Sequence, residues 1–88
     1  MKFAVPEDVL VQELDGEMVL LNLENEQYYG LDDVGTSMWT AITKFSSLDA
    51  ALESLQVKYE VEPNQLCQDL QELTQQLVAH GLLKIVQD

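Results

Sequence analysis

The chain has 88 residues, of which 47% are hydrophobic and 23% are charged, and we expect a single domain over residues 1–88 because either half alone would bury too small a core. Sixteen acidic residues against four lysines give a net charge of −12, which makes nucleic acid a poor candidate partner because a nucleic-acid interface needs several cations to displace phosphate counterions. The expected partners are neutral or basic.

The cysteine, histidine and hydropathy patterns exclude further classes. Cys67 is the sole cysteine and His80 the sole histidine, so the sequence predicts no disulfide, no metal site and no cofactor. No segment approaches the roughly 18 uninterrupted apolar residues of a membrane span. The first residues, MKFAVPEDVLVQ, lack the apolar region and cleavage site of a secretory signal. We therefore expect a cytoplasmic protein with no membrane partner.

The first third of the chain alternates apolar and polar residues, as half-buried strands do. Strands are expected over residues 9–12 and 17–23, joined by a hairpin at Asp15-Gly16, because both positions of this turn tolerate positive φ. A second turn leads into QYYGL, residues 27–31, whose aromatic residues suit a strand. The pattern predicts a three-stranded antiparallel meander.

From Asp32-Asp33 onward the apolar spacing changes to the helical period. The acidic pair predicts the N-cap of a first helix, and Ser46 with Asp49 predicts a capping box that opens a second helix. The buried face of the first helix is expected to contain Val34, Met38, Trp39, Ile42 and Phe45. The buried face of the second is expected to contain Leu48, Ala51, Leu52, Leu55 and Tyr59.

A third helix is expected from Pro63, which suits the first helical position, to His80. Gly81 is expected to end it, because a left-handed glycine after a helix lets the next residue fold back onto the helix end. The segment from residue 83 to 86 then forms either a short closing strand or a hydrophobic tail. The apolar stripe of this helix consists of Leu66, Leu70, Leu73 and Leu77.

Three strands followed by three helices, the last two at helix-turn-helix spacing, predict an α+β, winged-helix-like domain. Many domains with this layout bind DNA. Here the outer surface of the third helix carries glutamines and acidic residues, and no cation on it could reach phosphate or guanine. We expect a surface that is adapted to another kind of partner.

The third strand is expected at an open edge, since a three-stranded sheet exposes at least one row of unpaired donors and acceptors. It contains no proline or lysine that would discourage pairing, and Gly30 allows another backbone to approach closely. A peptide could bind here by strand addition, in a groove beside the third helix. The simpler alternative is that Tyr28, Tyr29 and Leu31 only fill the core or cover the edge.

The third helix has two flanks beside its buried stripe, and a helical wheel does not decide which one borders the sheet. Asp69 and Gln76 lie on one flank, and Cys67, Thr74 and Val78 lie on the other. Asp69 either meets a polar or basic group of a bound peptide or is an ordinary solvated charge. The candidate peptide-binding residues are Gln27, Tyr28, Tyr29, Gly30, Leu31, Asp69, Leu70, Leu73, Gln76 and Leu77.

Two stretches carry a family resemblance: VLLNLENEQYYGLDDVGTSMW, on the strand that Asp15-Gly16 opens, and DLQELTQQLVAHGLL near the C-terminus. Over residues 8–83 the chain resembles the PqqD-like family, the recognition elements of ribosomally synthesised peptide (RiPP) pathways. The resemblance implies a non-catalytic protein that binds the leader of a precursor peptide along the third strand, with Asp69, Leu73 and Gln76 beside it. It also implies delivery of the leader to a leader peptidase or another tailoring enzyme.

The resemblance is compatible with two pathways. We favour lasso-peptide maturation with a leader peptidase, and the alternative is delivery to a radical-SAM enzyme in pyrroloquinoline quinone biosynthesis. Asp32 stands where the family usually has asparagine, and the chain lacks the arginines common in relatives. The implied backbone contacts therefore carry over more directly than the implied side-chain contacts.

Other classes compete with peptide binding. The Ser46-Ser47-Leu48-Asp49 stretch and the strong acidity suggest a carrier protein, but carrier domains are helical, whereas the first third here alternates as strands. A DNA-binding winged helix is the alternative at the level of fold. An enzyme built on Cys67 and His80 is disfavoured, because thirteen helical residues separate the two side chains by about 20 Å.

Overall fold

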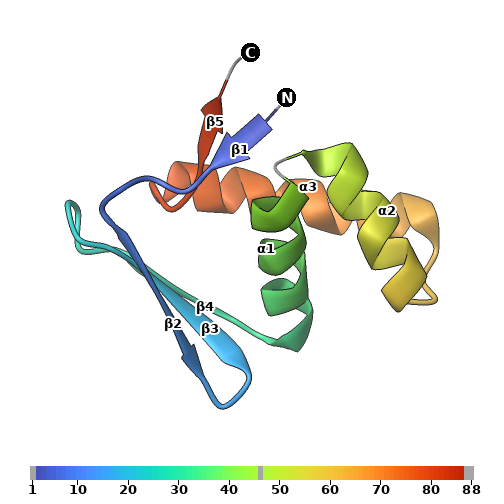
Figure 1. Cartoon of the computed structure of the whole chain (residues 1–88), viewed down its shortest axis with the longest axis horizontal. Helices are drawn as coiled ribbons and strands as arrows, with labels where there is room; N and C mark the ends of the chain where they lie inside the picture. The colour runs from blue at the N-terminus through green and yellow to red at the C-terminus, as the bar shows by residue number, and fades with distance from the viewer. Residues whose placement is uncertain (1, 46, 87–88) are drawn as a thin grey trace.

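The computed structural model describes residues 2–45 and 47–86 (Figure 1). The order of elements confirms the predicted α+β class, with a three-stranded antiparallel sheet that precedes three helices. Two further short strands, one near each end of the chain, pair with each other. The elements are β1 Lys2–Ala4, β2 Val9–Leu14, β3 Glu17–Asn22, β4 Tyr28–Leu31, α1 Asp33–Phe45, α2 Leu48–Lys58, α3 Pro63–Ala79 and β5 Lys84–Val86.

Two hairpins build the three-stranded sheet, whose strand order is β2-β3-β4. Asp15 and Gly16 form the first turn with φ angles of 53° and 85°, which confirms the hairpin predicted from the Asp-Gly pair. The second hairpin closes where the N–H of Asn22 donates to the carbonyl of Gln27 at 2.8 Å. The central strand is therefore β3, and β2 and β4 form the two edges.

One face of this sheet contributes to the core. Leu20 of β3 is fully buried, Leu31 of β4 is 3% exposed, and Tyr29, which is opposite Leu20 in the ladder, is half-buried. Because side chains alternate along a strand, Tyr28 lies on the opposite face, where it is 73% exposed. The core contains Phe3, Leu20, Leu31, Met38, Trp39, Ala41, Ile42, Ala51, Leu55, Leu66, Leu70, Leu77, Leu82 and Leu83.

The terminal strands β1 and β5 form a separate two-stranded antiparallel sheet, with Phe3 opposite Ile85. The sequence suggested a closing strand near the C-terminus as one of two possibilities, and the structure contains that strand. Its partner β1 was missed, because a three-residue strand has too little periodicity to be recognised. Phe3 is 4% exposed, so this pairing closes the core near the chain ends.

The predicted buried face of α1 is partly wrong at its two ends. Met38, Trp39 and Ile42 are buried as expected, but Val34 is 46% exposed and Phe45 is 41% exposed. Helical spacing places all five on one side, yet the surrounding elements cover only the middle of the helix. Both ends of this stripe therefore face surface hollows, as described below.

Helix α2 begins one residue later than the predicted capping box requires. Ser47 is the N-cap, and its hydroxyl accepts a hydrogen bond from the N–H of Ala50 at 3.2 Å. The predicted cap, Ser46, lies outside the described residues. The apolar stripe of α2 is confirmed, with Ala51 and Leu55 buried against the core.

The C-terminus of α3 ends as the sequence predicted. Gly81 has a φ of 72°, its N–H donates to the carbonyl of Val78 at 3.1 Å, and the N–H of Leu82 donates to the carbonyl of Leu77 at 2.9 Å. These two bonds form a Schellman motif, which satisfies carbonyls that the helix itself leaves unpaired. Leu82 folds back and is fully buried.

We predict that Gly81→Ala destabilises the protein by at least about 2 kcal/mol, whereas Gly16→Ala costs about 1–2 kcal/mol, the strain of a left-handed alanine alone. A methyl group at Gly81 would lie 2.8 Å from Asn22 Nδ2, but one at Gly16 would meet nothing within 4 Å. Urea unfolding followed by circular dichroism measures both. Equal losses would show that contact with Asn22 does not matter.

Candidate functional site

A buried amide side chain ties the loop between β3 and β4 to the end of α3. Asn22 is 6% exposed, and its Nδ2 donates to the carbonyl of Gly81 at 2.6 Å. Its Oδ1 accepts from the N–H groups of Glu24 at 2.8 Å and Asn25 at 3.2 Å. One side chain therefore satisfies backbone groups of two segments that are 59 residues apart in the chain.

Three more contacts continue this connection toward β4. Asn25 Nδ2 donates to the carbonyl of His80 at 3.4 Å. The Tyr29 hydroxyl donates to Gln76 Oε1 at 2.8 Å, and the ring of Tyr29 meets that of His80 edge-on, with centroids 5.6 Å apart. The start of β4 is thus held beside the last two turns of α3.

Beyond these contacts, a groove of about 400 Å³ lies between β4, α1 and α3. Its wall on the α3 side is formed by Asp69 and Leu73, so the flank that carries Asp69 borders the sheet. On the opposite flank, Thr74 is 5% exposed and turned into the core. The groove is lined by Tyr29, Gly30, Leu31, Asp32, Val34, Gly35, Met38, Asp69 and Leu73.

The outer edge of β4 has unpaired backbone groups that face away from β3. Because Asn22 bonds to Gln27, and bonded pairs alternate in an antiparallel ladder, the next bonded pair is Leu20 with Tyr29. The N–H and C=O groups of Tyr28 and Gly30 therefore point outward. Within the part of the chain that the structure describes, β4 pairs with β3 alone.

The end of β4 is fixed by the start of α1. Asp32 Oδ1 accepts from the N–H of Gly35 at 2.7 Å, which confirms the predicted acidic N-cap. The Thr36 hydroxyl accepts from the N–H of Met18 at 3.2 Å and donates to the carbonyl of Leu31 at 3.4 Å. The Thr36 side chain thereby bridges β3 and β4 beside the Met18–Leu31 pair.

The structure separates the candidate residues into four groups. Five of them, Tyr29, Gly30, Leu31, Asp69 and Leu73, line the groove. Gln76 lies at its end through the bond to Tyr29. Leu70 and Leu77, with exposed fractions of 1% and 0%, support the groove from beneath and are not accessible to a ligand, contrary to their place among the expected contacts. Gln27 and Tyr28 lie outside the lining, and the side chain of Tyr28 is on the outer face of the sheet.

Sequence reasoning missed the contribution of α1 to the groove. Val34, Gly35 and Met38 line it, but the helical period could only assign Val34 and Met38 to the core face. The useful signal was Gly35, because a Cβ there would lie 3.2 Å from Asp32 Oδ1 and 3.3 Å from Leu31 Cδ2. A glycine after an acidic cap thus lets the cap side chain fold over the helix start.

The chemistry of the groove is that of a binding surface. Its lining combines apolar side chains with the two carboxylates of Asp32 and Asp69. Asp69 accepts a hydrogen bond from Gln65 at 2.9 Å. Among the described residues, no group of three or more His, Cys, Asp or Glu side chains is placed to hold a metal ion. In the same residues, no helix has the length and apolar character needed to cross a bilayer.

Comparisons with known proteins give a consistent pattern. A family model described as coenzyme PQQ synthesis protein D (PqqD) matches residues 17–83. One similar structure is TbiB1 in complex with the TbiA(beta) leader peptide. TbiB1 is 27% identical in sequence to this chain, the match covers 100% of both chains, and the TM-score is 0.86. Lasso peptide synthetase B1 complexed with the leader peptide is 24% identical over 97% of this chain and 100% of that one, also with a TM-score of 0.86, which is a likeness of fold. No curated protein is significantly similar in sequence.

We predict that the bond between Tyr29 and Gln76 contributes about 0.5–1 kcal/mol to folding, the lower part of the usual range because it is exposed. A double-mutant cycle of Tyr29→Phe and Gln76→Ala, measured by urea unfolding, should give this coupling. The matched cycle with Tyr28→Phe should give none, since the Tyr28 side chain is on the other face. Equal coupling in both cycles would contradict the assignment.

Proposed function

The chain belongs to the PqqD family, and from this membership we propose that it binds the leader segment of a ribosomally synthesised precursor peptide as an added strand on β4. The observation that carries the proposal is the open edge of β4 beside a groove lined by α1 and α3. The similarity to TbiB1 supports the proposal, because TbiB1 is bound to a leader peptide and matches the whole of this chain at 27% identity.

Strand addition uses the backbone of β4 for affinity. The outward N–H and C=O groups of Tyr28 and Gly30 offer a ladder to an incoming strand, which would become the fourth strand of the sheet. Backbone pairing is independent of the leader sequence. Specificity must therefore come from alternate leader side chains that enter the groove.

The second edge of the sheet, β2, is also unpaired on its outer side among the described residues. Two features favour β4 over β2. The groove beside β4 is walled by α1 and α3, whereas the hollow that Leu10 and Gln12 of β2 help to line lies on the outer face of the sheet and has no lining residue in a helix. The hydrogen bonds from the β3–β4 loop to α3 also hold β4, and not β2, beside a helix.

The groove has an apolar floor and a polar rim. Leu31, Met38 and Leu73 offer contact to an apolar leader side chain, and burial of such a side chain would contribute about 1.5–3 kcal/mol. Asp69 and Gln76 on α3 would accept hydrogen bonds from a polar or basic group of the leader. Because their flank borders the sheet, both belong to the proposed contact surface.

The proposed role is that of a non-catalytic adaptor that presents the leader to a separate enzyme. A leader peptidase in lasso-peptide maturation is the favoured partner, in line with the leader-bound state of TbiB1 and with the shared fold of lasso peptide synthetase B1. The second candidate is delivery to a radical-SAM enzyme in pyrroloquinoline quinone biosynthesis, which the description of the family model favours. Both roles use the same leader groove.

We expect Gly30→Pro to weaken leader binding at least ten-fold, because proline removes an outward N–H and places its ring where the added strand would lie. Gly30→Ala keeps the N–H and meets no atom within 4 Å, so its affinity should stay within two-fold of the wild type. The measurement is fluorescence polarisation of a labelled precursor leader peptide. Circular dichroism checks folding.

Val11→Pro is the matched control for the other edge. By the same alternation, the N–H of Val11 points outward from β2, so this change removes one edge donor without touching β4. Leader affinity should be retained. Loss of binding in Val11→Pro and retention in Gly30→Pro would move the leader to β2 and refute our proposal.

For the side-chain contacts, we expect Asp69→Asn to weaken leader binding about three-fold or more, the size of one exposed charged contact. Glu72→Gln is the control, since it removes the same charge from the same helix and Glu72 accepts an equivalent bond from Gln68. Its affinity should be unchanged. The same polarisation assay measures both, and equal effects would indicate a general charge effect instead of a contact of Asp69.

A further inference from the structure

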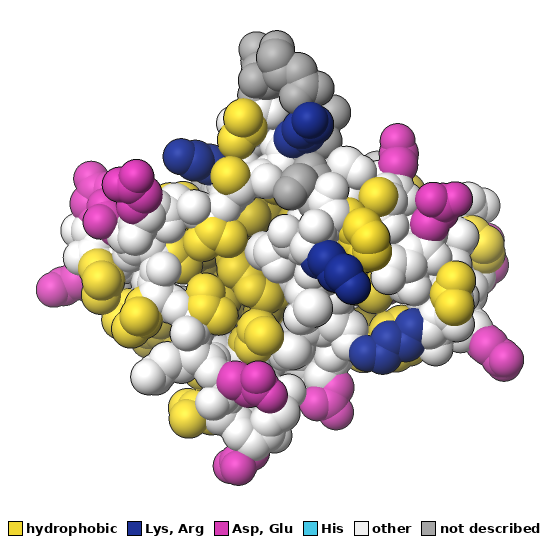
Figure 2. Space-filling model, viewed as in Figure 1, with side chains coloured by type: hydrophobic (Ala, Val, Ile, Leu, Met, Phe, Trp, Pro, Cys, Tyr) yellow, Lys and Arg dark blue, Asp and Glu magenta, His cyan; other side chains and the backbone are white. Residues whose placement is uncertain are grey.

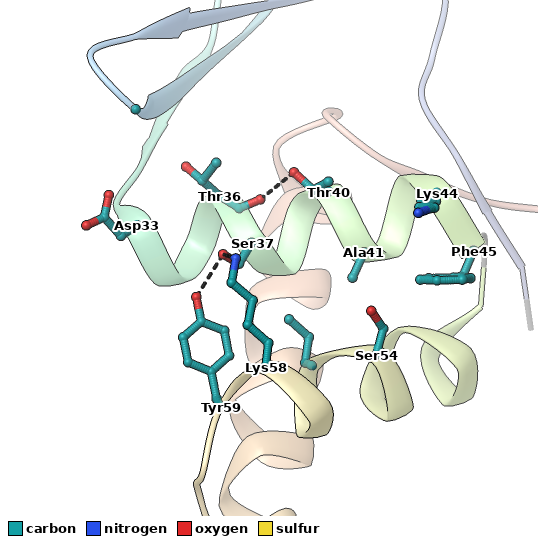
Figure 3. A pocket seen from close by; sticks show the side chains of 12 residues that line it. Asp33, Thr36, Ser37, Thr40, Ala41, Lys44, Phe45, Ser54, Lys58 and Tyr59 are labelled. Carbon is teal, nitrogen blue, oxygen red and sulfur yellow. Dashed lines mark hydrogen bonds between the residues drawn. The ribbon is translucent and has the colours of Figure 1, made fainter.

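A second hollow lies between α1 and α2, on the other side of α1 from the leader groove. It has a volume of about 460 Å³ and shares no lining residue with that groove. Figure 3 shows Asp33 at one end, Lys44 and Phe45 at the other, and Lys58 between them, with Ser54 on the α2 side. We call this hollow the α1–α2 cleft.

Several hydrogen-bond donors in the α1–α2 cleft have no acceptor among the described residues. Ser37 Oγ accepts from Lys58 Nζ at 3.0 Å and from the Tyr59 hydroxyl at 2.8 Å (Figure 3). The Ser37 hydroxyl hydrogen then has no acceptor within the described residues, and the Lys58 ammonium keeps two further N–H groups. The other polar groups of the lining are the hydroxyls of Thr36, Thr40 and Ser54, the Lys44 ammonium and, at the end opposite Lys44, the Asp33 carboxylate. The three donors without acceptors, away from the Asp33 end, favour a ligand that only accepts, such as a carboxylate.

Both lysines of the cleft lack a carboxylate partner, although the chain has sixteen acidic residues against four basic ones. Lys44 Nζ lies 5.5 Å from the ring centroid of Phe45, and Lys58 Nζ lies 5.5 Å from that of Tyr59. Within residues 2–45 and 47–86 neither ammonium forms an ion pair. Lys44 and Lys58 each lie in the last turn of a helix, where the helix dipole favours a cation. The dipole alone does not explain why both side chains line the same cleft.

The charge pattern of the surface supports the same interpretation. Figure 2 shows two basic side chains side by side over α1 and α2, while acidic side chains lie toward the outline of this face. Salt at physiological strength screens charges beyond about 8 Å, so a ligand in the cleft is governed by the nearby lysines more than by the net charge. The expectation of neutral or basic partners is therefore reversed locally.

The spacing along α1 defines the ligand further. Ser37, which anchors Lys58, and Lys44 are seven residues apart, which is two helical turns or about 10 Å. Carboxylates three residues apart in an extended peptide, or seven apart in a helix, have about the same separation.

From the lysine pair, the donors without acceptors and this spacing, we propose that the α1–α2 cleft binds an acidic segment of a partner protein, with two carboxylates on Lys44 and Lys58. The exposed Phe45 at one end offers an apolar contact beside the first carboxylate. Since the two hollows share no lining residue, the acidic segment and a leader can bind at the same time.

Two fluorescein-labelled peptides serve as probes: an extended one with glutamates three residues apart and a helical one with glutamates seven apart. We expect at least one to bind at low salt, and its glutamine version to bind about ten-fold more weakly. Lys44→Gln and Lys58→Gln should each weaken binding about three-fold, and the double variant about ten-fold, as expected for exposed ion pairs. All three variants should bind a leader as the wild type does.

Lys84→Gln is the control, because it changes the net charge equally at an exposed site in β5. The proposal is overturned if neither glutamate probe binds, if the glutamine versions bind equally well, or if Lys84→Gln weakens binding as much as the cleft variants. Equal competition by a short RNA of the same charge also overturns it, because the cleft would then take any polyanion. Failure of leader binding alone would refute the proposed leader-binding function and would not affect the proposed acidic-segment site.

Discussion

The amide side chain of Asn22 is the contact on which the arrangement of the sheet and α3 depends. It satisfies two loop N–H groups and the carbonyl of Gly81 at once, in a place from which solvent is nearly excluded. A buried amide left without these partners would cost about 1–3 kcal/mol, so the loop and the helix end hold each other in position. The contact also requires a glycine at position 81, because a Cβ there would collide with Asn22 Nδ2.

This connection explains how a short edge strand remains open without packing onto the helix beside it. The loop is bonded to the end of α3, Tyr29 bridges to Gln76, and Thr36 bridges β3 to the last residue of β4. Between these fixed points β4 keeps its outward backbone groups. Open edges invite aggregation, and β4 carries none of the usual lysines or prolines against it. The net charge of −12 keeps copies of this chain apart by repulsion, while the uncharged backbone of a bound peptide strand is not repelled.

Helix α1 separates two surfaces of different chemistry. Val34, Gly35 and Met38 face the groove beside β4, where the charged side chains are the carboxylates of Asp32 and Asp69. Thr36, Ser37 and Lys44 face the α1–α2 cleft, which contains two of the four basic residues of the chain. The side chain of Thr36 takes part in both the cleft lining and the end of the β3–β4 ladder. The proposed leader site and the proposed site for an acidic segment therefore lie on two different sides of one helix.

The sequence by itself determined the features that depend on local backbone chemistry. The Asp15-Gly16 hairpin, the acidic cap before α1, Pro63 at the start of α3 and Gly81 at its end all follow from the φ angles and hydrogen bonds that these residue types favour. The tertiary structure alone decided which flank of α3 borders the sheet, that Leu73 lines the groove whereas Leu70 and Leu77 of the same stripe do not, and that Lys2–Ala4 pairs with Lys84–Val86. Periodicity shows which residues share a face of one element. It cannot show what that face meets, because this depends on how elements far apart in the chain are placed against one another.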